Sequence, residues 1–374
     1  MNEPRTFDDL LTPAALVDLD RVDANLARMA SYTAQSGLAL RPHTKTHKTP
    51  EFAAEQVRHG ATGLTVATLR EAEVMASVSD DLLLAYPPVG RHKLARLFDL
   101  PESVRITVAV DSAEVLSALA QHARERARTM GVLIEIDAGM HRVGIADPAE
   151  AAALALTVTQ HARLEWRGLM FYPGHIREHL NEQTQPLQTL ANTLNAHLDA
   201  LARLNLVPAV VSGGSTPAAA RSHEVEQLTE IRPGTYIFND RTTAAIGACG
   251  WDDCAYTILA TVVSTAVSGQ AVVDAGSKAL SREDIRGADA PGFGALLEWP
   301  DIQVKALSEE HGLLDLSRTT WRPRIGERIR IVPNHVCVSV NLQERLWGVR
   351  GQRIEASWPI QARNWSPAPT AVLT

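Results

Sequence analysis

Residues 38–48 read LALRPHTKTHK, a short apolar run that leads into a basic cluster. The run Leu38–Arg41 has the length and the apolar character of a buried strand. Seven more runs of this kind occur between residues 14 and 237, and longer stretches with helical spacing of apolar residues separate them. The eight predicted strands are Ala15–Asp18, Leu38–Arg41, Gly63–Ala67, Asp81–Ala85, Arg105–Val110, Val132–Ile136, Gly168–Phe171 and Ala209–Val211.

Strands that alternate with helices predict an α/β fold. The predicted helices are Arg21–Ser36, Thr49–His59, Leu69–Val78, Ala113–Met130, Pro148–Gln160 and Gln183–Leu204. Eight strands in this rhythm favour a TIM-type (β/α)8 barrel over an open doubly wound sheet. In such barrels the loops that follow the strands build the active site, so polar clusters directly after a strand are the best site candidates.

The helical rhythm fades after about residue 245, and strand-like runs take over, with a loop expected at 286–293. We therefore predict a barrel domain at 14–245 and a mainly antiparallel β domain at 246–374, to which residues 1–13 also belong. The predicted strands of this second domain are Tyr256–Val263, Ala271–Asp274, Arg328–Val332, Val336–Asn341 and Arg353–Trp358.

Composition excludes several classes of partner. The chain has 374 residues, 45% of them hydrophobic, and its net charge of -7 is not gathered into long blocks of one sign, so we expect no nucleic-acid partner. It lacks a run of about 18 apolar residues and a basic leader followed by an apolar segment, so we expect no membrane association. Three cysteines, an odd and small number, fit a reducing compartment. We expect a cytoplasmic protein.

The basic cluster follows the second predicted strand and centres on Lys45. Three cations and two histidines lie within Arg41–Lys48. A lysine becomes a nucleophile toward carbonyl groups when nearby positive charge or desolvation lowers its pKa. A solvated basic loop is the alternative interpretation, and the position at the end of a strand favours the functional one.

A second cluster, SGGSTP, follows the eighth predicted strand. Small residues let backbone N–H groups approach a phosphate, and hydroxyl groups add further donors. In these barrels the last two strands commonly precede a phosphate site, although a tight turn is the alternative. The candidate anion-binding residues are Ser212, Gly213, Gly214, Ser215 and Thr216.

A third cluster lies near the end of the chain and combines Glu310–Gly312 with the segment Pro333–Cys337. If this segment is a strand, residues i and i+2 share a face, so His335 and Cys337 could both point at one metal ion. An imidazole paired with a thiolate suits zinc. A buried structural cysteine beside a hydrogen-bonded histidine is the alternative.

Together these clusters resemble the fold-type III pyridoxal-phosphate enzymes of the D-threonine aldolase and D-serine dehydratase family. The resemblance covers nearly the whole chain, and the lysine motif and the late His-x-Cys are its specific parts. Further matching segments are Leu11–Ala14, Val17–Asp20, Asp137–Gly144, Arg232–Tyr236, Val272–Gly276 and Glu310–Gly312.

The resemblance implies an alanine-racemase-like barrel followed by a β domain, as the pattern predicts. It implies pyridoxal 5'-phosphate bound to Lys45 as a Schiff base, with Arg142 near the phenolic oxygen and Tyr172 in contact with the ring. It also implies a divalent metal (zinc, manganese or magnesium) on His335 and Cys337, and a homodimer. The implied phosphate contacts are Gly213, Gly214, Ser215, Thr216 and Tyr236.

The implied activity is that of a lyase acting on a small D-amino acid. Our leading hypothesis is retro-aldol cleavage of D-3-hydroxy amino acids such as D-threonine, with His175 as the base; a surface histidine is the alternative for that residue. Dehydration of D-serine or D-threo-3-hydroxyaspartate stays open, because Cys337 matches the dehydratases whereas Val338–Asn341 and Ala356–Arg363 resemble the aldolases. An amino-acid racemase and a non-catalytic pyridoxal-phosphate carrier also stay open.

Overall fold

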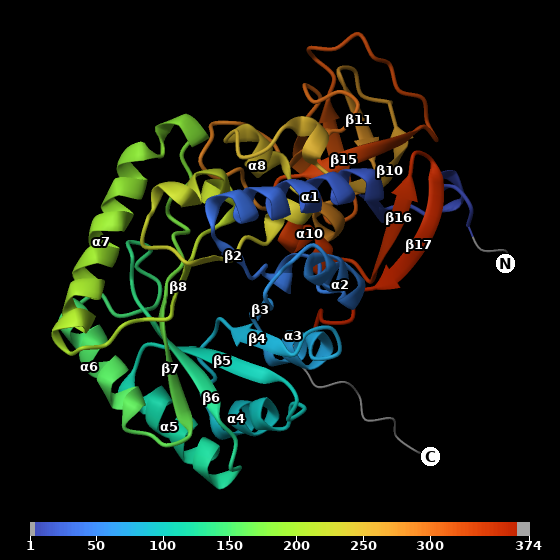
Figure 1. Ribbon diagram of the computed structural model, residues 1–374. Helices are drawn as coiled ribbons and strands as arrows, with labels where there is room; N and C mark the ends of the chain where they lie inside the picture. The colour runs from blue at the N-terminus through green and yellow to red at the C-terminus, as the bar shows by residue number, and fades with distance from the viewer. Residues whose placement is uncertain (1–3, 365–374) are drawn as a thin grey trace, which may run out of the picture. The chain divides into compact units, whose positions relative to one another are not determined.

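The computed structural model describes residues 4–364 (Figure 1). These residues form two compact units. The first, here called the barrel unit, contains residues 29–177, 181–234 and 361–364; the second, the sheet unit, contains residues 4–28, 178–180 and 235–360. Helix α1 (Leu19–Ser36) contributes residues to both.

The barrel unit is built on eight parallel strands. They follow one another in the order β2-β9-β8-β7-β6-β5-β4-β3. The ring closes between β2 and β3, where Thr65 N donates to the carbonyl of Pro42 at 2.9 Å and His43 pairs with Thr65 in a parallel bridge. The strands are β2 (Ala39–Leu40), β3 (Leu64–Val66), β4 (Asp81–Leu84), β5 (Arg105–Val110), β6 (Met130–Glu135), β7 (Leu164–Met170), β8 (Val210–Gly213) and β9 (Glu230–Ile231). The predicted eight-stranded barrel is confirmed.

One predicted barrel strand is wrong. Ala15–Asp18 forms β1 (Ala14–Asp18) in the sheet unit, where it pairs antiparallel with β10 and parallel with β16. A fully buried apolar strand looks alike in either kind of sheet, so the pattern alone could not assign it. The eighth barrel strand is instead β9, whose two residues are too few to give a recognisable pattern.

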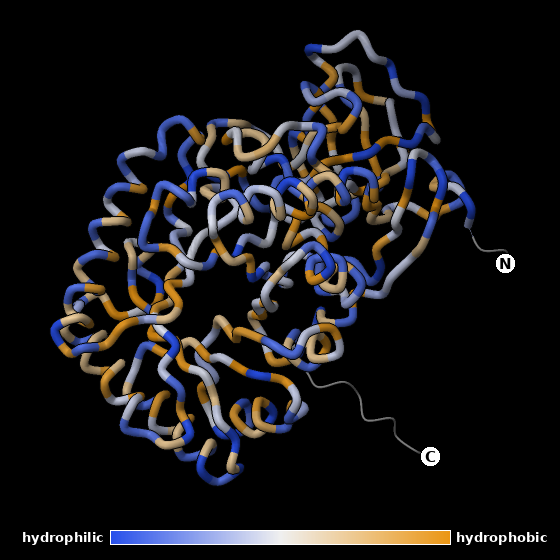
Figure 2. Tube along the Cα trace, in the orientation of Figure 1, coloured by the Kyte–Doolittle hydropathy of each residue, from blue (hydrophilic) through white to orange (hydrophobic). Residues whose placement is uncertain are grey.

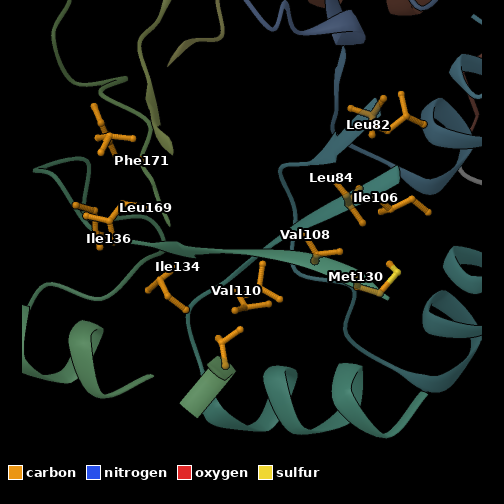
Figure 3. Packing of buried hydrophobic residues seen from close by; sticks show 14 of the residues in the cluster. Leu82, Leu84, Ile106, Val108, Val110, Met130, Ile134, Ile136, Leu169 and Phe171 are labelled. Atoms are coloured by element: carbon orange, nitrogen blue, oxygen red, sulfur yellow. The ribbon is translucent and has the colours of Figure 1, made fainter. Parts of the chain in front are cut away.

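Successive residues on the barrel strands point to opposite faces. Leu82 and Leu84 belong to the large cluster that also includes helix residues, whereas Leu83 belongs to a separate cluster with Leu133 of β6. Figure 3 shows members of the large cluster along the neighbouring strands β4 to β7. In the Cα trace of Figure 2, hydrophilic and hydrophobic positions interchange along helix α7, whose buried residues include Leu187, Leu190 and Leu194. The helices of the unit are α2 (Pro50–Arg58), α3 (Leu69–Met75), α4 (Arg91–Phe98), α5 (Ala113–Glu125), α6 (Pro148–Thr159) and α7 (Thr184–Arg203).

The sheet unit contains a mostly antiparallel sheet of nine strands, as predicted for the second half of the chain. Its main path runs β13-β14-β11-β10-β1-β16-β17, while β15 pairs with β10 and β12. Besides β1, the strands are β10 (Tyr256–Ser264), β11 (Gln270–Val273), β12 (Gly294–Leu296), β13 (Val304–Leu307), β14 (Gly312–Asp315), β15 (Arg328–Pro333), β16 (Arg345–Arg350) and β17 (Arg353–Pro359). The short helices are α8 (Arg241–Ala245), α9 (Ser277–Leu280) and α10 (Val336–Leu342).

The predicted strand Val336–Asn341 is wrong, because these residues form α10. Val-Cys-Val-Ser-Val alternates β-branched and small residues, which favours a strand locally. The tertiary environment overrides that preference: Val336 and Val340, one helical turn apart, are both buried, and Ser339 Oγ donates to the carbonyl of Ala279 at 2.7 Å. The expected loop at 286–293 has no regular structure.

The predicted domain limits, 14–245 and 246–374 with 1–13, remain predictions, because compactness does not show where a segment folds independently. Their outermost residues, 1–3 and 365–374, lie outside the described part of the chain. Across residues 4–364, no helix has the length and apolar character needed to cross a membrane.

Candidate functional site

Lys45 lies in the loop that follows β2, within the single 3-10 turn Thr44–Thr46. The imidazole of His43 accepts a hydrogen bond from Lys45 N at 3.5 Å and so caps this turn. Thr44 and Thr46 are fully buried, whereas Lys45 is half-buried. The backbone around the lysine is therefore fixed by the interior while its side chain reaches the mouth of the barrel.

The other two cations of the basic motif are paired with acids. Arg41 Nη1 donates to Asp81 Oδ1 at 2.7 Å, and Arg41 Nε donates to Glu230 Oε2 at 2.8 Å. Lys48 Nζ lies 3.7 Å from the carboxylate of Glu71. Lys45 makes no salt bridge with any residue from 4 to 364. The motif therefore separates into structural ion pairs and one lysine with an unpaired ammonium group.

Both histidines of the motif are buried and uncharged at neutral pH. Burial, with the nearby charges of Lys45 and Arg232, lowers the pKa of His43 well below its ordinary value. Burial lowers the pKa of His47 to about 4, although the side chain of Gln56 and the backbone of Thr49 oppose the shift. Less positive charge surrounds Lys45 than the sequence suggests.

Tyr172, directly after β7, brings Lys45 and Arg142 together. Lys45 Nζ is 5.4 Å and Arg142 Cζ is 5.0 Å from the centroid of the Tyr172 ring. Cations at this distance from an aromatic face are attracted to it. Loops after β2, β6 and β7 thus bring three of the predicted cofactor residues together at the carboxyl ends of the barrel strands.

The loop that carries Arg142 is held tightly. Asp137 accepts hydrogen bonds from the backbone N–H groups of Gly139 at 3.0 Å and His141 at 2.9 Å. Gly144 has a φ of 98°, and a Cβ there would lie 2.4 Å from the carbonyl carbon of Ile136, so only glycine fits. Arg142 is therefore presented from a fixed turn although its side chain is exposed.

The predicted phosphate loop has the form of a cradle. Gly214 has a φ of 84°, and a Cβ on Gly213 would lie 2.1 Å from the ring of Phe171. The hydroxyl of Ser215 is buried and has no hydrogen-bond partner within residues 4–364. An orphaned hydroxyl at a glycine turn after β8 fits an anionic oxygen, so these residues fit the phosphate of pyridoxal phosphate. Thr216, at the start of the 3-10 segment Thr216–Glu224, is also buried.

Ser212 is engaged in a different way from its neighbours in the loop. Its hydroxyl donates to Glu230 Oε1 at 2.5 Å and accepts from Arg232 Nη1 at 2.6 Å. The side chain of Ser212 therefore belongs to a buried charged network, and its role in phosphate binding stays a prediction.

The predicted base His175 and the predicted phosphate contact Tyr236 lie in different units. His175 is exposed in the loop after β7, and a Cβ on Gly139 would lie 3.0 Å from its ring atoms Cε1 and Nε2. The loops after β6 and β7 therefore touch at His175. Tyr236 is buried in the 3-10 turn Thr235–Ile237 of the sheet unit.

Sequence reasoning did not single out Glu135 and Arg232. Arg232 Nη2 donates to the carbonyl of Phe171 at 2.7 Å, and burial lowers the pKa of this arginine to about 10 although Glu230 and Glu135 oppose the shift. Glu135, the last residue of β6, lines a pocket together with Arg142 and Tyr172. Its place at the carboxyl end of a barrel strand was a signal that could have identified it.

His335 and Cys337 both lie in the sheet unit, at the start of α10 and not on a strand. His335 is the N-cap residue of α10, and its side chain hydrogen-bonds with Cys337 in the first turn. Asp240 Oδ2 lies 3.4 Å from His335 Nδ1 and accepts from Val336 N at 3.1 Å, so this fully buried carboxylate orients the imidazole. Burial opposes the charged imidazolium, but Cys337 and Asp240 outweigh it and raise the pKa of His335 well above its ordinary value.

The donor set of this pair fits a metal in part. An imidazole nitrogen and a thiol sulfur are the ligands that zinc prefers. Within residues 4–364, however, no group of three or more His, Cys, Asp or Glu side chains is placed to hold a metal ion. Two protein ligands would leave positions for water or substrate oxygens.

Comparisons with known proteins agree with this geometry. The family model for the N-terminal domain of alanine racemase matches residues 17–242, and the model for a putative serine dehydratase domain matches residues 255–349. D-threo-3-hydroxyaspartate dehydratase of Delftia sp. (strain HT23) is 35% identical over 89% of this chain and 93% of its own length. D-threonine aldolase of Arthrobacter sp. is 30% identical over 95% of this chain and 93% of its own length. The crystal structure of D-threonine aldolase from Filomicrobium marinum superposes with a TM-score of 0.88 at 31% identity, and covers 97% of this chain and 98% of that one.

Proposed function

Because this chain belongs to the fold-type III pyridoxal-phosphate lyases, the family of D-threonine aldolase and D-threo-3-hydroxyaspartate dehydratase, we propose that it cleaves D-3-hydroxy amino acids such as D-threonine. The products would be glycine and an aldehyde. The observation that carries the proposal is the convergence of Lys45, Arg142 and Tyr172 after β2, β6 and β7. An orphaned Ser215 hydroxyl at the neighbouring loop supports it.

Three residues of the barrel unit would hold the pyridine ring of the cofactor. Lys45 would attach it covalently, Arg142 would face its phenolic oxygen, and Tyr172 would contact its ring. Pyridoxal phosphate supplies the electron sink that accepts the electron pair of the bond that breaks. The proposed phosphate contacts are Ser212, Gly213, Gly214, Ser215, Thr216 and Tyr236.

Two side chains would move protons during the reaction. We assign His175 as the base that removes the proton of the substrate β-hydroxyl, and its exposure in the loop after β7 leaves it accessible to substrate. Lys45 Nζ, once displaced by the substrate amine, would return a proton to the α-carbon. With both groups in place, the proton lost from the hydroxyl is balanced by the proton gained at carbon.

His335 and Cys337 would hold a divalent metal, zinc, manganese or magnesium, that lowers the pKa of the substrate β-hydroxyl. Asp240 would fix the ring of His335 through Nδ1 and leave Nε2 for the metal. His335 and Cys337 can act in this reaction only if their metal reaches the same substrate molecule as Lys45. Removal of the metal with a chelator should then abolish cleavage.

A second candidate function is dehydration of D-serine or D-threo-3-hydroxyaspartate. Cys337 favours it, because this residue matches the dehydratases of the family, and so does the 35% identity with the Delftia dehydratase. In this reaction Lys45 Nζ would remove the α-proton, and the β-hydroxyl would leave as hydroxide. A racemase or a non-catalytic pyridoxal-phosphate carrier would need neither His335 nor Cys337.

We also propose a homodimer in the cytoplasm. All three cysteines are free thiols, which fits a reducing compartment.

The products of the reaction test the proposal. The purified protein is incubated with D-threonine, D-serine and D-3-hydroxyaspartate, with and without a metal chelator, and both aldehyde and ammonia are followed. We expect glycine and acetaldehyde from D-threonine, and loss of both with chelator. Ammonia with a 2-oxo acid would favour the dehydratase instead, chelator-resistant racemisation would favour a racemase, and inertness toward all three substrates would favour the carrier.

A further inference from the structure

Glu135 is a buried acid that the proposed reaction does not use. The residue is 3% exposed at the end of β6, and its Oε2 atom has no hydrogen-bond partner within residues 4–364. A buried carboxylate without hydrogen-bond donors is disfavoured relative to the neutral acid. Buried acids are normally satisfied, so this one requires an explanation.

Charged groups from several elements face Glu135. Arg232 follows β9, Arg142 follows β6, Asp111 follows β5, and Tyr172 after β7 lines the same pocket. Burial raises the pKa of Glu135 to about 7, the two arginines oppose this shift, and the carboxylate of Asp111 adds to it. Glu135 is therefore poised between its two protonation states at neutral pH.

We propose that Glu135 takes up a proton from solvent when an anionic ligand binds in this pocket. The ligand is pyridoxal phosphate if the proposed function holds, and the inference rests on that function. An anion that reaches Arg142 weakens the attraction between this arginine and the carboxylate of Glu135, and it adds a negative charge nearby. Both effects favour the neutral acid.

Proton uptake by Glu135 makes the binding of the anion weaker at high pH. Binding that raises the pKa of an acid is coupled to proton uptake, so affinity for the anion falls as pH rises above the pKa of the free protein. The proton ends on a carboxylate oxygen, and no other group is consumed. The neutral acid gains an O–H donor that the ionised form lacks.

Calorimetric titration of the cofactor-free protein with pyridoxal phosphate, in buffers of different ionisation enthalpy, counts the protons taken up. Near neutral pH the wild type should take up a fraction of a proton per site more than Glu135→Gln, because part of the Glu135 population is ionised beforehand. Above pH 7 the affinity of the wild type relative to this variant should fall by up to about tenfold per pH unit.

Glu165→Gln is the matched control. Glu165 lies on β7, its side chain is 57% exposed, and its replacement removes the same charge from outside the pocket. This variant should keep the proton uptake of the wild type. Equal uptake by the wild type and Glu135→Gln would overturn the proposal.

If Glu135→Gln does not fold, an infrared difference spectrum of the wild type tests the proton uptake instead. Cofactor binding should produce the C=O band of a protonated carboxyl group, and glutamate labelled with carbon-13 should shift it. If the cofactor binds through Lys45 but no such band forms, the inference is wrong and the proposed function stands. A wild type that does not bind pyridoxal phosphate would overturn both.

Discussion

Arg41 gives the sharpest stability prediction, because sequence reasoning grouped it with Lys45 and its contacts are structural. Its guanidinium lies between Asp81 at 2.7 Å and Glu230 at 2.8 Å, and the three side chains are only 5–12% exposed. Arg41→Ala leaves two carboxylates in the barrel interior without this partner. Removing one member of a buried ion pair typically costs about 3–5 kcal/mol.

The value should lie near the lower end of that range. Glu230 keeps the hydroxyl of Ser212 at 2.5 Å, and Asp81 keeps Arg105 at 3.3 Å, so neither acid loses every partner. We therefore expect Arg41→Ala to lower the free energy of unfolding by about 3 kcal/mol. Arg41→Lys keeps the charge but cannot donate to both carboxylates as the guanidinium does. Its free energy of unfolding should therefore lie between those of the wild type and Arg41→Ala.

Urea unfolding followed by tryptophan fluorescence measures this difference. Arg58→Ala is the control, because Arg58 pairs with Glu55 on the surface, with its side chain 67% exposed. Exposed pairs contribute about 0–1 kcal/mol. The reasoning would be refuted if Arg41→Ala were no more destabilising than Arg58→Ala.

Three further outcomes follow from single sites. Gly213→Ala places a Cβ 2.1 Å from a buried ring, so urea unfolding should show a loss of about 1–3 kcal/mol, and an unchanged free energy would contradict the geometry of the cradle. The pKa of His47 is about 4 in the folded state, below its ordinary 6.5, so the free energy of unfolding of the wild type should fall by up to about 3 kcal/mol as pH decreases from 6.5 to 4. His47→Gln should show a weaker dependence on pH, and the same dependence in both proteins would contradict this assignment. Cys337→Ala should lose zinc after dialysis whereas Cys249→Ala keeps it, as elemental analysis can show; equal zinc contents would remove Cys337 from the metal site.

Much of the barrel could be predicted because its strands carry local signals. Seven of the eight predicted runs are barrel strands, since each is a short buried segment between helices of clear periodicity. The residues 230–231 could not be found, because two residues define no period. Residues 336–341 prefer a strand locally, but tertiary packing makes them a helix. The side chains of His335 and Cys337 still interact in this helix.

The candidate site likewise contains residues that could be predicted from the sequence and residues that could not. Motifs that are contiguous in sequence, such as the one around Lys45, can be recognised from their local composition. The buried network could not be predicted, because Arg41 and Glu230 are 189 positions apart and only the closed barrel brings them together. Glu135 escaped notice since one acid at the end of the apolar run MGVLIE has no pattern of its own.

The attachment point of the cofactor tests the central claim most directly. The protein is saturated with pyridoxal phosphate, reduced with borohydride to fix the bond between cofactor and lysine, digested, and mapped by mass spectrometry. We predict the pyridoxyl group on Lys45, the lysine of the motif whose ammonium has no carboxylate partner. Modification of Lys48 in its place, or the absence of a modified peptide, would contradict the account.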